Sequence, residues 1–170
     1  MSGPGPSFLA DAMLGKLARW LSLMGWDAVP ADPRATDLEL LARASREGRV
    51  FLTRDRRVPE VAGLRRVLVE SPRLEAQLKQ VLGDLGLAAD PARWFTRCAM
   101  CGAALADLPR EAALPLVPPK VRELDTSFRR CPECRRVYWE GTHVERARQK
   151  LARWGFGAQS PSGLGGSSRP

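Results

Sequence analysis

The sequence has no long apolar run, although 44% of its 170 residues are hydrophobic. A membrane-spanning helix needs about 20 consecutive apolar residues, so the sequence predicts no membrane span and no membrane partner. Residues 1–6 lack both the charged segment and the apolar segment of a secretory signal. We therefore expect a cytoplasmic protein whose apolar residues form a folded core.

Histidine and cysteine are scarce, with one histidine, His143, and four cysteines. All the cysteines fall in two C-x-x-C pairs separated by 29 residues: Cys98, Cys101, Cys131 and Cys134. A two-residue spacer lets both sulfurs of a pair turn towards one ion, and four thiolates complete the tetrahedral shell of zinc. The pairs therefore predict a structural zinc site that has no open coordination position.

Two disulfides or a redox-active pair are the alternative interpretations of these cysteines. Disulfides are rare in the cytoplasm, and two matched pairs favour a metal over a redox motif. Gly102, directly after the first pair, can adopt the backbone turn that a metal-binding loop needs. His143 could be a polar residue packed near the zinc or an RNA contact, and a hydrogen-bonded structural role inside the ribbon is favoured over catalysis, because four better metal ligands lie nearby. Tyr138 and Trp139 could stack on bases, but burial in the core of a small ribbon is favoured.

Acidic residues are outnumbered by basic ones. The 27 Lys and Arg against 19 Asp and Glu give a formal charge of +8. Nearly all the positive charges are arginines, whose planar guanidinium can hold a phosphate through two hydrogen bonds. This balance favours a polyanionic partner, RNA in the first place and DNA as an alternative. The other explanation for the positive charge is a general bias of the source organism towards residues such as arginine.

Hydrophobic periodicity predicts alternating strands and helices in the first part of the chain. Short apolar runs predict buried strands, and apolar residues at helical spacing predict helices between them. Thr36 followed by acidic residues is a good helix start. The order of elements favours an α/β domain over residues 7–90, with a mostly parallel sheet and helices on both faces.

The remainder of the chain has a different composition: it contains the cysteines and many prolines, and it shows little helical periodicity. We expect a small zinc ribbon with a C-terminal helix over residues 94–154. Residues 155–170 are rich in Gly, Ser and Pro, and this composition predicts a disordered tail.

Three aspartates from separate parts of the sequence are expected at one edge of the sheet. Asp11 and Asp55 follow predicted strands, and Asp37 opens the helix that leads into the second of these strands. In a parallel sheet the ligand crevice lies outside the carboxyl ends of the strands. Clustered carboxylates repel each other unless a cation lies among them, and hard oxygen ligands suit Mg²⁺ or Mn²⁺. Taken singly, each acid could instead start a helix or stabilise a turn. Glu39 is a weaker candidate for a metal ligand than the three aspartates.

Several motifs, in order, carry a family resemblance. They are residues 8–21 (FLADAMLGKLARWL), 37–41 (DLELL), 49–56 (RVFLTRDR), the second cysteine pair and 137–143 (VYWEGTH). Together they resemble, over residues 7–152, the PIN-like RNase family named for the C-terminal domain of the mut-seven exonuclease. The resemblance implies a PIN-like three-layer α/β/α domain, a C-terminal four-cysteine zinc ribbon, and a ribonuclease dependent on Mg²⁺ or Mn²⁺. It places the acidic positions on Asp11, Asp37 and Asp55. The usual fourth acid has no clear counterpart, so the resemblance does not fix whether one or two metal ions bind.

The favoured hypothesis is a ribonuclease that prefers single-stranded RNA. The carboxylates would hold the catalytic metal, the ribbon would orient RNA, and phosphates would be bound by Arg19, Arg54 and Arg56. The first alternative is a non-catalytic RNA-binding or ribosome-associated module with the same fold. A toxin-like PIN protein held by a partner is the second alternative.

Overall fold

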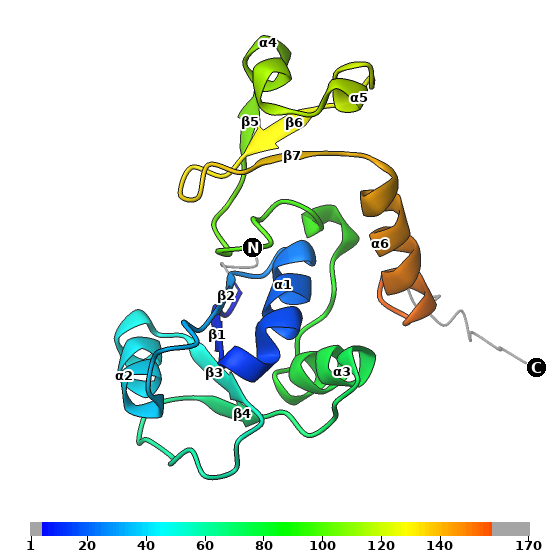
Figure 1. Cartoon of the computed structure of the whole chain (residues 1–170). Helices are drawn as coiled ribbons and strands as arrows, with labels where there is room; N and C mark the ends of the chain where they lie inside the picture. Colours follow the sequence, from blue (N-terminus) through cyan, green and yellow to red (C-terminus); the bar gives the residue numbers. More distant parts are fainter. Residues whose placement is uncertain (1–4, 158–170) are drawn as a thin grey trace, which may run out of the picture.

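A computed structural model describes residues 5–157, and the predicted disorder of residues 158–170 lies outside the described residues. The first part of the chain is a four-stranded parallel sheet in the order β2-β1-β3-β4 (Figure 1). The strands are β1 (Phe8–Ala10), β2 (Ala28–Pro30), β3 (Val50–Thr53) and β4 (Arg66–Leu68). The register places Leu9 of β1 between Val29 and Phe51, so the central strands are flanked on both sides and buried.

Helices cover both faces of this sheet. The helices α1 (Gly15–Leu23) and α3 (Leu74–Asp84) pack on the face that carries Phe8 and Leu52. The helix α2 (Asp37–Glu47) packs on the opposite face, against Leu9 and Phe51. This division follows from strand geometry, because successive side chains of a strand point to opposite faces. The mixed α/β class and the parallel sheet predicted from the sequence are confirmed.

The cysteine-containing part forms a second, antiparallel sheet in the order β5-β6-β7 (Figure 1). Its strands are β5 (Ala106–Leu108), β6 (Phe128–Arg130) and β7 (Val137–Trp139), and two short helices, α4 (Arg110–Ala113) and α5 (Pro119–Arg122), lie between the first two strands. The remaining short elements are the 3-10 turns η1 (Ala12–Leu14), η2 (Pro91–Arg93) and η3 (Leu114–Leu116). A small core around Phe128 and Val117 stabilises this sheet.

The last helix, α6 (Thr142–Arg153), returns to the first core instead of extending the cysteine sheet. Leu151 is fully buried there, and Trp154 packs on Trp20 of α1 with ring centroids 5.2 Å apart. Phe156, within the predicted tail, is also buried in this core. The sequence predicts α6 as part of a ribbon, and its packing joins the cysteine-containing part of the chain to the parallel sheet. No helix within residues 5–157 is long and apolar enough to cross a membrane.

Candidate functional site

The four cysteines gather in one cluster. The Sγ atoms of Cys98 and Cys134 are 3.5 Å apart, as are those of Cys101 and Cys131, and all four lie within 4.8 Å of one another. A tetrahedral zinc site with Zn–S bonds of about 2.3 Å separates its sulfurs by about 3.8 Å. A disulfide would need about 2.05 Å, and the thiols are free. The cluster therefore fits a metal such as zinc.

The backbone of both cysteine loops is shaped for this cluster. The N–H groups of Met100 and Cys134 each donate to a cysteine sulfur over 3.4 Å. The residue after each second cysteine is left-handed, Gly102 with φ 75° and Arg135 with φ 66°. A Cβ at Gly102 would lie 2.7 Å from the carbonyl oxygen of Ala28 in β2. The first loop therefore rests directly on the parallel sheet, and only glycine fits there.

The pKa values of Cys98, Cys101 and Cys134 are shifted in different directions. Burial would raise the pKa of Cys98, but hydrogen bonds from Tyr138 Oη, at 3.0 Å, and from backbone N–H groups lower that pKa to about 7. Burial raises the pKa of Cys101 to about 12 and also raises the pKa of Cys134. Four thiols this close cannot all ionise unless a cation balances them. The electrostatics therefore agree with the geometry of a metal site.

Asp11 is fixed at the carboxyl end of β1 by hydrogen bonds to both of its oxygens. Its Oδ1 accepts from the N–H groups of Met13 and Leu14, at 2.9 and 3.1 Å. Its Oδ2 accepts from Thr53 Oγ1 at 2.6 Å and from the N–H of Arg54 at 3.2 Å. Asp11 is only 9% exposed. The Thr53 contact joins the ends of β1 and β3, so the carboxylate is held in one orientation.

Asp55 lies on the same edge and is held by Arg57. Its two oxygens accept hydrogen bonds of 3.1 and 2.8 Å from the Arg57 guanidinium, and Oδ1 accepts a third from the Arg57 N–H at 2.8 Å. These hydrogen bonds, the side-chain ones first, lower the pKa of Asp55 to about 2. Asp37 lies close enough for its charge to contribute to the raised pKa of Arg57. Arg57 is therefore paired with Asp55 and is also within electrostatic range of Asp37.

The structure brings Asp11 and Asp55 together through Thr53, whose Oγ1 also accepts from the Asp55 N–H at 3.0 Å. Asp37 is exposed in the first turn of α2. The three carboxylates do not form a group whose oxygens could share one ion, and the cysteine cluster is the only such group within residues 5–157. Glu39 is occupied by the capping box of α2, where its carboxylate accepts from Thr36. The catalytic metal site on these acids stays a prediction.

The three arginines suggested for phosphate binding have different surroundings. Arg54 is half-buried beside Asp11, and its Nε is buried without a hydrogen-bond partner. Arg56 is exposed on the loop between β3 and β4. Arg19 is exposed on α1, at the side of the cysteine cluster, where its guanidinium lies 3.6 Å from the Sδ of Met100. Arg54 and Arg56 therefore lie next to the acids, whereas Arg19 lies between the acids and the cysteines.

Sequence reasoning missed three contacts of these sites. Arg57 follows Asp55 by two residues, a spacing typical of an Asx turn, and this signal could have identified the pair. The hydrogen bond from Tyr138 to Cys98 joins residues 40 apart and leaves no local signal. His143 is exposed and packs edge-on against Trp139, at 5.8 Å between ring centroids, instead of lying inside the ribbon.

These features define an α/β protein that carries acids at the carboxyl ends of its strands and a separate four-cysteine metal-binding cluster. The sequence model of the Mut7-C RNAse domain matches residues 6–151, and the chain belongs to this family. The resemblance identified in the sequence is thereby confirmed, and family membership suggests a nuclease-like role. Comparison with the curated proteins and with the solved structures finds no match for the chain.

Proposed function

We propose that the protein is a metal-dependent ribonuclease with a PIN-like three-layer fold and a C-terminal zinc ribbon. The observation that carries this proposal is the Asp11–Thr53–Asp55 linkage at the carboxyl ends of β1 and β3, in a member of an RNase domain family. Asp11 is held there by four hydrogen bonds. Such pre-orientation is what a metal ligand or a catalytic carboxylate requires.

Asp11, Asp37 and Asp55 would hold Mg²⁺ or Mn²⁺. Carboxylate oxygens are the ligands that these ions prefer. When bound, such an ion activates a water molecule and neutralises the charge of the scissile phosphate. Asp55 is ionised at neutral pH even at the ordinary pKa of 3.8, and Arg57 lowers that pKa further, to about 2. The Arg57 guanidinium occupies both oxygens of Asp55, so a metal ion would compete with it for this carboxylate.

The arginines near the acids would bind the RNA backbone. The backbone N–H of Arg54 contacts Asp11, and its side chain carries a buried Nε without a hydrogen-bond partner. Arg56 is exposed two residues later on the same loop. Arg19 would bind phosphate further along the strand. A formal charge of +8 supports the association of the chain with RNA, and with DNA as a weaker alternative.

The four cysteines would bind a structural zinc ion, since a closed shell of thiolates leaves no position for substrate. Cys98 and Cys101 lie on the loop before β5, and Cys131 and Cys134 on the turn between β6 and β7, so one ion joins these two segments at the same end of the small sheet. Free thiols used as metal ligands suit a reducing compartment, and we propose a cytoplasmic location.

One observation favours the non-catalytic RNA-binding alternative. The three carboxylates do not converge, and Arg57 neutralises Asp55. The test is incubation of the purified protein with mixed single-stranded RNAs and Mn²⁺ or Mg²⁺. Cleavage that EDTA stops supports the ribonuclease, whereas RNA binding with no metal-dependent product supports the alternative.

A further inference from the structure

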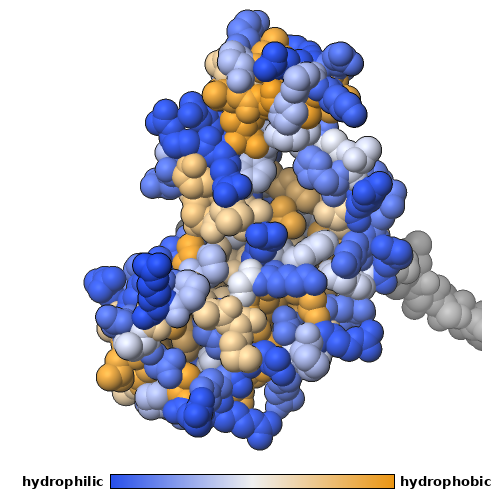
Figure 2. All heavy atoms as spheres, in the orientation of Figure 1, coloured by the Kyte–Doolittle hydropathy of each residue, from blue (hydrophilic) through white to orange (hydrophobic). Residues whose placement is uncertain are grey.

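A pocket of about 200 Å³ lies between the parallel-sheet part and the cysteine sheet. Its walls come from the end of α1, the segment before the first cysteine pair, β7 and the first turns of α6. Aromatic and aliphatic side chains line it, among them Phe95, Trp139, His143, Leu23, Val144 and Ala147. Figure 2 shows the surface hollowed between the upper sheet and α6, with apolar atoms at the bottom of the hollow. The lining does not include the aspartates Asp11, Asp37 and Asp55 or any of the four cysteines.

Phe95 is held in this pocket by an unusual backbone conformation. Its φ is 60°, a left-handed value that a bulky residue rarely adopts. Two contacts stabilise it: its N–H donates to the carbonyl of Leu23 at 2.7 Å, and its own carbonyl accepts from Arg129 at 3.2 Å. The Arg148 guanidinium lies 4.8 Å from the centre of the Phe95 ring. Backbone strain of this kind concentrates at functional sites, where it positions a side chain.

The rim of the pocket is cationic and its wall is aromatic. Arg129 lines the pocket and is 39% exposed, while Arg148 packs on the lining residue Phe95 and is 38% exposed. Glu140 is the acid of the lining, and its carboxylate lies 3.8 Å from Arg148. Trp139 and His143 supply two further aromatic rings. Aromatic faces and arginine planes are the groups on which proteins stack unpaired bases of single-stranded RNA.

The size of the pocket suits one planar ring system. Its volume of about 200 Å³ is below the range of about 300–1,000 Å³ of pockets for drug-sized ligands. A peptide segment or a folded RNA helix would not enter it. A single base can enter, while its phosphates stay outside near the arginines of the rim.

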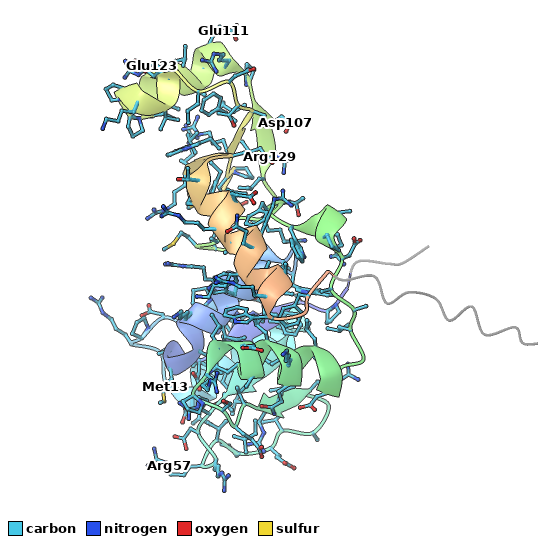
Figure 3. The ribbon with its side chains drawn as sticks, turned by 90° about the vertical axis from the view of Figure 1, so that its right-hand side faces the viewer. Met13, Arg57, Asp107, Glu111, Glu123 and Arg129 are labelled. Carbon is cyan, nitrogen blue, oxygen red and sulfur yellow. The ribbon has the colours of Figure 1, made fainter. Side chains whose placement is uncertain are left out.

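A basic stripe on α1 runs from the pocket towards the edge of the parallel sheet that carries Asp11 and Asp55, which we call the carboxylate rim. Lys16, Arg19 and Leu23 lie three or four residues apart on α1, and therefore on one face of this helix. Lys16 and Arg19 are exposed, and Leu23 lines the pocket. Asp11 lies before the opposite end of α1. Figure 3 accordingly shows Met13 and Arg57 at one end of the molecule and the pocket residue Arg129 towards the other.

We propose that the pocket binds one unpaired nucleobase of a single-stranded RNA whose backbone follows the Lys16–Arg19 stripe of α1 to the carboxylate rim. This inference rests on the proposed ribonuclease function and adds a specificity site to it. The nine residues of α1 rise about 13 Å at 1.5 Å per residue. Stacked nucleotides of a strand advance about 3.4 Å each, so the base in the pocket lies about four nucleotides or more from the cleaved bond.

The experiment measures binding of a ten-nucleotide oligoadenylate, labelled with fluorescein, to the zinc-loaded full chain without Mg²⁺ or Mn²⁺. The variant Ala147→Phe fills the pocket and leaves all charges unchanged. Ala152→Phe adds the same ring at an exposed position of α6 outside the pocket lining and is the matched control. We expect Ala147→Phe to weaken binding about tenfold, within the effect of losing one stacked base, and Ala152→Phe to bind like the parent.

A ribose-phosphate oligomer of the same length without bases keeps every phosphate contact. We expect the parent to bind it about tenfold more weakly than oligoadenylate, and Ala147→Phe to bind both oligomers alike. The proposal that the pocket binds a base is contradicted if the parent binds the two oligomers equally. It is also contradicted if Ala147→Phe leaves the binding of oligoadenylate unchanged. Cleavage is scored separately with Mn²⁺: base-dependent binding without cleavage removes the ribonuclease proposal and leaves the base pocket standing.

Discussion

Thr53 Oγ1 donates a hydrogen bond of 2.6 Å to Asp11 Oδ2 across the adjacent ends of β3 and β1. The same hydroxyl accepts from the N–H of Asp55. Thr53 is fully buried, so no water molecule can replace the hydroxyl without a rearrangement of the strand ends. The hydroxyl therefore positions one acid and the backbone of another.

We predict that Thr53→Val lowers metal-dependent cleavage about 10- to 100-fold, as losing the partner of a metal ligand typically does. Valine keeps the shape of the side chain but leaves Asp11 Oδ2 with only the Arg54 N–H as a donor. Thr53→Ser keeps the hydroxyl and is the control. The rates are compared at saturating Mn²⁺, and equal rates for the parent and the valine variant would contradict the positioning role.

Arg57→Ala is predicted to raise the pKa of Asp55 from about 2 towards the ordinary value of 3.8. Since the folded-state pKa is below the ordinary value, the ion pair stabilises the fold above about pH 4, and this contribution is lost as the pH falls towards 2. NMR titration of the Asp55 carboxyl carbon measures the shift. Arg56→Ala, at the neighbouring exposed arginine, should leave the pKa of Asp55 in place.

The same Arg57→Ala variant should bind Mn²⁺ more tightly than the parent, because the guanidinium no longer competes for Asp55. Calorimetric titration with Mn²⁺ measures the affinity. Weaker binding by the variant would mean that Arg57 supports the metal site instead of occupying it.

Gly102→Ala should destabilise the protein more than Gly48→Ala. Both glycines have a left-handed φ, of 75° and 63°, so each substitution incurs about 1–2 kcal/mol of backbone strain. A Cβ at Gly48 meets nothing within 4 Å, whereas one at Gly102 meets Ala28 O at 2.7 Å. The extra steric conflict predicts a further loss of about 1–3 kcal/mol in the free energy of unfolding. Urea unfolding curves give both values, and equal losses would show that the first cysteine loop does not press on β2.

Tyr138→Phe should release zinc to a chelator more readily than the parent. The parent is expected to carry one zinc ion per chain, and Tyr138 Oη is a hydrogen-bond partner of Cys98 Sγ at 3.0 Å. Removing such a partner of a metal ligand weakens metal binding about 10- to 100-fold. Zinc release is followed with a colorimetric chelator, with Cys131→Ser as the variant that lacks a ligand. Unchanged release from Tyr138→Phe would contradict the role of this hydroxyl.

Local signals predicted the elements that position the site. The helix start at Thr36 is confirmed as a capping box with Glu39, because both partners lie within one turn of chain. The strand before Asp55 is β3, since the run from Val50 to Thr53 is apolar and fully buried. The cysteine cluster was also predictable, because the spacing within each pair is set by the geometry of the loop.

Contacts between distant segments were beyond the sequence. The left-handed backbone of Phe95 is imposed by Leu23 and Arg129, which are far away in the chain. The return of α6 to the first core depends on the contact between Trp20 and Trp154. The composition of the sequence near α6 had instead predicted that this helix belongs to the ribbon. Tertiary packing determines such features, and local sequence propensity does not predict them.

The most direct test of the account compares the parent with Asp11→Asn in the cleavage of single-stranded RNA with Mn²⁺. Asp125→Asn, at an exposed aspartate of the cysteine-containing part, is the matched control, and zinc content and the midpoint of thermal unfolding verify that each variant is folded. The account predicts EDTA-sensitive cleavage by the parent and by Asp125→Asn, and a loss of at least about 100-fold for Asp11→Asn. Equal cleavage by Asp11→Asn and the parent would contradict a carboxylate-held catalytic metal.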